Sequence, residues 1–62
     1  MWKKSDAVER NQILVIGNGQ QAPYGDGELI QTFSATKKGA REAENLADRW
    51  YNRPFIIDPQ SE

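Results

Sequence analysis

Residues 29–58 read LIQTFSATKKGAREAENLADRWYNRPFIID, and the order of apolar and polar side chains along this stretch decides the fold. Residues 29–35 alternate between the two kinds, which is typical of a half-buried strand. Residues 36–51 carry their apolar side chains on one side of a helix, and residues 55–57 form a short apolar run. Because almost no residues separate these elements, the stretch predicts strand, helix and strand in a small α+β domain.

The predicted helix over residues 36–51 has a start signal and a stop signal. Thr36 can accept a hydrogen bond from the first turn as the N-cap. Asn52 can take the left-handed conformation that ends a helix, and Pro54 forces the preceding residue out of helical geometry. The apolar side of the helix comprises Ala40, Ala43, Leu46, Ala47, Trp50 and Tyr51.

Two further strands complete the expected sheet. Four consecutive aliphatic residues at 13–16 (ILVI) predict a strand that is buried on both faces or central in a sheet. A glycine-rich loop over residues 17–27 joins it to the strand at 29–35 as an antiparallel hairpin. Alternatively, the two strands extend into this segment and leave a shorter tip near Pro23. In that second strand, Leu29 and Phe33 are expected on the face toward the helix and Ile30 on the other face. A right-handed crossover after the helix makes the last strand parallel to the second, so it can lie beside the second strand or, antiparallel, beside the first. The unbroken aliphatic run favours a central first strand, which gives a three-stranded β-β-α-β sheet in the order 2-1-3 with the helix on one face.

The chain of 62 residues is expected to form a single small domain over residues 1–62. Residues 12–58 are the folded unit and residues 59–62 a tail. Residues 1–11 are interpreted as a flexible arm or a short helical turn capped by Ser5. Trp2 in this arm is expected to pack back on the core; an exposed Trp2 would instead be a contact for a partner.

Composition restricts the chemistry. The chain has no Cys and no His, so disulfides, thiolate nucleophiles and imidazole bases are absent and a zinc site is not expected. A thin sheet with one helix hardly encloses the roughly 300–1,000 Å³ of a usual ligand pocket. We therefore expect no enzyme activity, no catalytic residues, no metal and no cofactor.

Charge and hydropathy indicate a cytoplasmic protein without a membrane segment. The net charge is −1, which argues against a strongly basic nucleic-acid binder. The longest apolar run, at residues 13–16, is far shorter than a membrane span, and the start MWKK lacks the apolar segment of a secretion signal.

Two groups of residues are candidate partner contacts. Lys37, Lys38 and Arg41 fall in the first turns of the predicted helix, where the helix dipole disfavours cations. Such a local conflict can mark a contact with an acidic partner or with phosphate, and the alternative is a solvated surface without a role. Tyr24 and Asp26, in the glycine-rich loop, form a second candidate contact; Tyr24 is an aromatic anchor or folds onto the sheet.

One stretch resembles small phage-encoded inhibitors, among them inhibitors of bacterial RNA polymerase and anti-CRISPR proteins. The pattern consists of residues 33–36 (FSAT), Ala43, Ala47, residues 50–51 (WY) and residues 54–56 (PFI). It covers about half of the chain. The resemblance implies a single domain with a small sheet, one helix and no catalytic residues, and it assigns no functional residue.

We therefore expect a non-catalytic protein-binding module, with a phage-encoded inhibitor or modulator of a host protein, acting in host takeover, as its specific form. One alternative is a small nucleic-acid-binding protein that uses Lys37, Lys38 and Arg41. Another is a homo-oligomeric structural or accessory subunit, such as a homodimer that pairs through a sheet edge.

Overall fold

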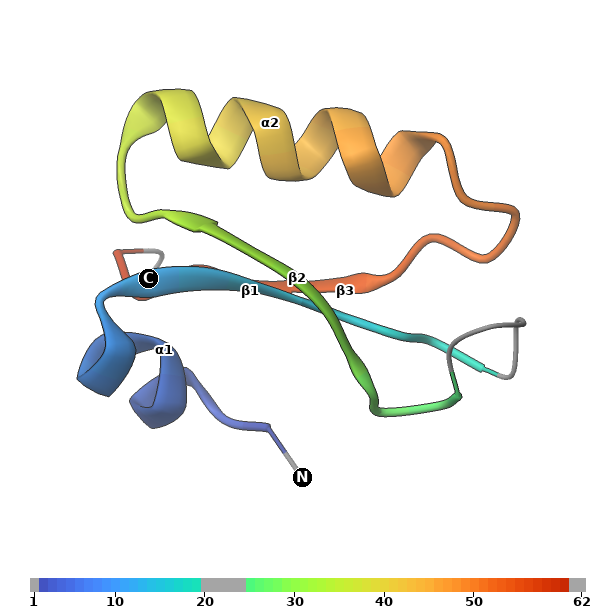
Figure 1. Cartoon of the computed structure of the whole chain (residues 1–62), viewed down its shortest axis with the longest axis horizontal. Helices are drawn as coiled ribbons and strands as arrows, with labels where there is room; N and C mark the ends of the chain where they lie inside the picture. Colours follow the sequence, from blue (N-terminus) through green and yellow to red (C-terminus); the bar gives the residue numbers. More distant parts are fainter. Residues whose placement is uncertain (1, 20–24, 61–62) are drawn as a thin grey trace.

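The structure, a computed structural model, describes residues 2–19 and 25–60 and has the predicted small α+β fold. Its elements are α1 (Lys4–Arg10), β1 (Gln12–Ile16), β2 (Leu29–Ser34), α2 (Lys37–Asp48) and β3 (Phe55–Ile57). Figure 1 shows α2 along one side of the sheet and α1 on the other side. The sheet is thus the middle layer of three.

The sheet order is β2-β1-β3, as the sequence predicts. β1 pairs antiparallel with β2 and also antiparallel with β3. This arrangement leaves β2 and β3 as the two edge strands. The aliphatic strand is central because it has a hydrogen-bonded neighbour on each side, which confirms the interpretation of residues 13–16.

The core consists of two apolar clusters, one on each face of β1. Ile13 and Val15 point toward α2, where they pack with Ala43. Leu14 and Ile16 point the other way and pack with Ala7 of α1. Successive side chains of a strand alternate between faces, so four aliphatic residues in a row serve both clusters.

A bulge in β2 changes which face its first residues occupy. Val15 lies opposite Gln31, but Ile16 lies opposite Leu29, so Ile30 is the extra residue. Because of the bulge, the side chains of Leu29 and Ile30 point to the faces opposite to those that strict alternation along β2 predicts. Leu29 packs in the α1-side cluster and Ile30 in the α2-side cluster with Phe33. The predicted faces of Leu29 and Ile30 are therefore wrong, whereas that of Phe33 is confirmed.

Residues 1–11 contain a helix rather than a flexible arm. The N-cap of α1 is Lys3 and not Ser5, because the Asp6 carboxylate accepts a hydrogen bond of 2.8 Å from the Lys3 N–H. The helix ends at Asn11, whose φ of 54° is left-handed. α1 adds a second helix to the predicted fold and covers part of the face that the sequence leaves open.

Trp2 packs back on the core, as expected. Its ring lies against the α1-side cluster, and its indole N–H donates a 3.0 Å hydrogen bond to the carbonyl oxygen of Gly27. The Arg10 guanidinium lies 4.8 Å from the ring centroid, within the range of a cation–π contact. Trp2 thereby ties the N-terminal segment to the end of the loop before β2.

α2 begins as predicted but ends earlier. Thr36 is its N-cap, and the Thr36 hydroxyl accepts from the Gly39 N–H at 3.1 Å. The helix stops at Asp48 rather than near residue 51, and the Tyr51 side chain is 95% exposed, so its predicted place on the apolar side is wrong. The residues that follow must turn back to β3, which a continued helix would prevent. Asn52 is not left-handed; among the described non-glycine residues, only Asn11 has a positive φ.

α2 is the longer of the two helices in the described part of the chain, at 12 residues. Neither of these helices is long and apolar enough to span a bilayer, which takes about 20 residues.

The ends of the loop over residues 17–27 continue the hairpin. The Gly17 N–H donates to the Glu28 carbonyl oxygen at 2.8 Å, and the Gly27 N–H donates to the Gly17 carbonyl oxygen at 2.9 Å. The middle of this loop, residues 20–24, lies outside the described residues. Of the predicted tail, residues 59 and 60 follow β3 in a turn, and residues 61–62 lie outside the described residues.

Gly39 allows α2 to lie directly on the end of β2. A Cβ atom at this position would stand 1.8 Å from the Ser34 carbonyl oxygen, a backbone atom that cannot rotate away. Gly39 is buried, and it is followed on the same side of the helix by the buried Ala43 and Ala47. These small residues set the distance between the helix and the sheet.

We predict that Gly39→Ala lowers the free energy of unfolding by about 3 kcal/mol, because the helix must move off the strand. Urea unfolding measures this change. In an unobstructed helix the same substitution would raise stability, so a stabilised variant would contradict the close contact. Gly25→Ala is the matched control, since a Cβ there meets only the end of the Glu28 side chain at 3.7 Å.

We predict that Trp2→Ala lowers the free energy of unfolding by about 2 kcal/mol, because the half-buried ring covers the α1-side cluster. Arg10→Ala removes the cation–π contact and the basic side chain of the last turn of α1, and it is expected to cost about 0.5 kcal/mol. Urea unfolding of the two variants separates the contributions. Equal effects would show that the ring contributes nothing beyond its contact with Arg10.

Candidate functional site

Lys37, Lys38 and Arg41, termed the basic cluster, lie exposed at the start of α2. The first turn of the helix contains no acidic side chain. Within residues 2–19 and 25–60, none of these three side chains has a hydrogen bond or an ion pair. The cluster therefore combines three cations with the positive end of the helix dipole, without an acid to offset them.

The second predicted contact lies at the other end of the sheet. Asp26 precedes β2, and its carboxylate accepts a 2.9 Å hydrogen bond from the Gly19 N–H, which closes the described base of the loop. Tyr24 lies outside the described residues. The six residues of β2 separate Asp26 from the basic cluster by about 20 Å. The structure does not bring the two predicted contacts together.

Three other charged side chains, on α2 and just before β3, are paired with one another. The Arg53 guanidinium forms ion pairs of 2.5 Å with both Glu44 and Asp48. The hydrogen bond from Arg53 to Glu44 is the main cause that raises the pKa of the guanidinium above its ordinary value. These pairs connect the outer face of α2 to the segment before β3. They offer no free charge to a partner, in contrast to the basic cluster.

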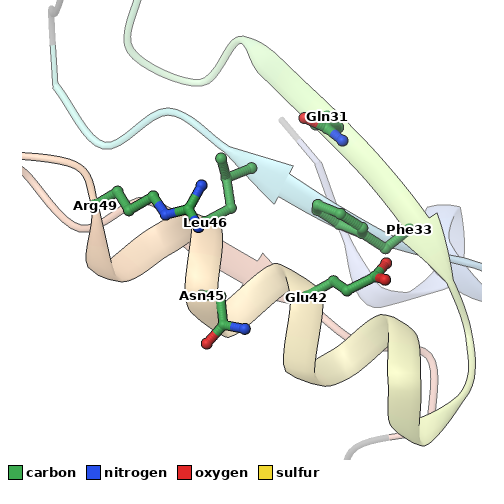
Figure 2. Close-up of a pocket in the computed structure, with 6 residues that line it drawn as sticks. All are labelled: Gln31, Phe33, Glu42, Asn45, Leu46 and Arg49. Atoms are coloured by element: carbon green, nitrogen blue, oxygen red, sulfur yellow. The ribbon is translucent and has the colours of Figure 1, made fainter.

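A groove of about 310 Å³ lies between α2 and the edge strand β2, and we call it the polar groove. Figure 2 shows the side chains that line it: Gln31, Phe33, Glu42, Asn45, Leu46 and Arg49. Phe33 and Leu46 are half-buried and supply the apolar surface, whereas the four polar side chains are exposed. Among the described residues, none of these four polar side chains has a hydrogen-bond or ion-pair partner.

A second groove, of about 490 Å³, lies on the other face of the sheet, and we call it the apolar groove. It is lined by five large apolar side chains, by Asp26 and by two glycines: Trp2, Ile16, Phe55, Ile56, Ile57, Asp26, Gly17 and Gly27. Phe55 is 57% exposed and lines this groove, although it lies in the apolar run at residues 55–57. Phe55 is the first residue of β3, an edge strand of three residues.

The described residues contain no group of three or more His, Cys, Asp or Glu side chains that could hold a metal ion. Neither groove brings a nucleophile together with a base: the titratable lining residues are Glu42 and Arg49 in one groove and Asp26 in the other. The two grooves present fixed charges, exposed amides and apolar surface to solvent.

Comparisons of the chain with protein-family models, with curated proteins and with solved structures each found no match.

If the positive charges of the basic cluster destabilise α2, then replacing them with negative charges must stabilise the fold. We predict that Lys37→Glu with Lys38→Glu raises the free energy of unfolding by about 1 kcal/mol at low salt, because acids complement the start of a helix. The gain should shrink at 1 M salt, where charges are screened. Urea unfolding measures both values.

The control for this prediction is Arg49→Glu, which places an acid at the opposite end of α2 and should lower stability. Arg49 is the C-cap of the helix. Loss of stability in both variants would contradict the dipole argument and would assign Lys37 and Lys38 a structural role.

Proposed function

We propose that the chain is a non-catalytic protein-binding module that contacts an acidic surface of another protein through the basic cluster. One observation carries the proposal: Lys37, Lys38 and Arg41 are exposed, and within the described residues they have no acidic partner. Helix stability alone would favour Asp or Glu at the first two positions. Carboxylates of a partner protein would form the ion pairs that these three cations lack within the described residues.

The geometry of the start of α2 favours such a contact. The helix dipole and the side chains attract the same kind of group, because both present positive charge to the same region of solvent. Gly39 and Thr36 fix this end of the helix against β2, through the close approach to Ser34 and the N-cap hydrogen bond. A partner therefore meets cations on a rigid support, which lowers the entropy lost on binding.

The specific form of the proposal is a phage-encoded inhibitor or modulator of a host protein in the bacterial cytoplasm. Support comes from the resemblance in the pattern of elements. The main alternative, binding of nucleic acid by the same cations, has less support because the net charge is −1.

We predict that Lys37→Glu with Lys38→Glu reduces capture of the partner about tenfold, because attraction to an acidic surface becomes repulsion. The purified chain is immobilised, incubated with bacterial lysate at moderate salt, and the retained proteins are quantified by mass spectrometry. The matched control is Lys3→Glu with Lys4→Glu, which makes the same change in net charge at the start of α1.

A protein retained by the original chain and by the control, but lost in the Lys37 and Lys38 variant, supports the proposal. Equal retention by all three chains, or no retained protein, contradicts it. A parallel gel shift with a 20-base-pair duplex tests the alternative. Duplex binding that falls steeply with salt and is lost in the same variant would favour nucleic acid as the ligand.

A further inference from the structure

The outer edge of β2 is open for pairing. β2 is the terminal strand of the sheet, and its pairing partner within the described residues is β1 alone. In an antiparallel sheet, alternate residues of an edge strand direct their N–H and C=O groups away from the neighbouring strand. With six residues, β2 offers a longer edge than the three residues of β3. It is therefore the better template for a further strand.

The polar groove runs beside this open edge. Gln31 and Phe33 of β2 form one wall, and the flank of α2 that faces the edge forms the other (Figure 2). A strand added to β2 would lie along the groove, with every second side chain directed toward α2. An apolar side chain of the added strand that points toward α2 would cover the half-buried Phe33 and Leu46.

The two ends of the groove carry opposite charges. Glu42 and Arg49 are seven residues apart on α2, which places them about 10.5 Å apart along the helix axis. Among the described residues neither is paired, with each other or with another side chain. α2 returns along β2 after a short connection, so Glu42 lies near the Phe33 end of the strand and Arg49 lies toward its beginning (Figure 2).

We propose that the polar groove binds an extended segment of a partner protein, which pairs antiparallel with β2. Antiparallel pairing is chosen because both existing pairs in the sheet have this direction. A strand antiparallel to β2 passes Glu42 first and Arg49 later. The segment therefore has a basic residue first, an apolar residue two positions on, and an acidic residue two positions after that.

The spacing of this motif follows from strand geometry. Residues one, three and five of a strand point to the same side and span about 13.6 Å. The distance of about 10.5 Å between Glu42 and Arg49 along the helix is shorter by about 3 Å, which these two long side chains can bridge. The side chain in the middle then meets Phe33 and Leu46. Closer spacing would leave no room for it.

This inference rests on the proposed function as a binding module, but it uses a different surface. It involves none of the residues of the basic cluster. A second copy of the chain is the competing occupant, because open strand edges also pair with each other. The charges distinguish the two, since β2 itself (LIQTFS) carries no charged residue for Glu42 or Arg49.

The test uses two synthetic peptides of the same composition, acetyl-TKTVTET-amide and acetyl-TETVTKT-amide, titrated into the nitrogen-15-labelled full chain. Both can pair with β2, but only the first presents its charges in the complementary order. We expect NMR shifts of the backbone amides of β2 and of Glu42 and Arg49. The first peptide should bind roughly fivefold more tightly, as two exposed ion pairs allow.

The decisive variant is Glu42→Lys with Arg49→Glu, which exchanges the two charges and leaves the net charge unchanged. It should bind the second peptide more tightly than the first. Glu9→Ala is the control, because Glu9 is exposed on α1 and neither lines the groove nor belongs to the basic cluster, and the preference for the first peptide should remain. Circular dichroism and urea unfolding establish that the variants are folded.

Several outcomes would overturn the inference. They are no shift at millimolar peptide, shifts on β3 instead of β2, and a preference that does not reverse in the charge-exchanged variant. Sedimentation that shows a dimer formed through β2 would assign the edge to a second copy. Because the experiment needs neither lysate nor the basic cluster, its failure leaves the proposed acidic-surface contact standing.

Discussion

Burial of β1 on both faces is the constraint on which the rest of the structure depends. Ile13, Leu14 and Val15 are fully buried and Ile16 is nearly so. A strand of this kind needs a cover on each face and a neighbour on each edge. α2 covers one face, and α1 with Trp2 covers the other, while β2 and β3 occupy the edges. Each remaining element therefore has its place because it shields one side of β1.

Features that depend on residues close in sequence could be predicted. Four aliphatic residues in a row identify the central strand, and Thr36 identifies the start of α2. The end of α2 could not be predicted, because its apolar periodicity continues beyond Asp48 through Trp50 and Tyr51. What ends the helix is the need to return to β3, a tertiary requirement. The bulge at Ile30 could not be predicted either. Leu29 and Ile30 are both apolar, so the order of apolar and polar residues does not show which of them faces α2.

The parts of the candidate site also differ in whether the sequence could predict them. The basic cluster is visible in the sequence because its three residues are neighbours on one helix. The two grooves are not visible, because each combines distant segments: Gln31 with Arg49 in one, and Trp2 with Phe55 in the other. The flank of α2 that carries Glu42, Asn45 and Arg49 could have been found from helical periodicity. That it borders an open strand edge required the sheet order as well.

The connectivity of the sheet also affects how the chain folds during synthesis. β1 pairs with β2 as a hairpin, but its other neighbour, β3, follows only after α2. From β1 to β3 the ribosome adds about 40 residues, which at about 5–20 residues per second takes a few seconds. During that interval one side of the most aliphatic strand has no hydrogen-bonded neighbour. The nascent chain is therefore most exposed to aggregation before its shortest strand docks, and chaperone contact is most useful in this period.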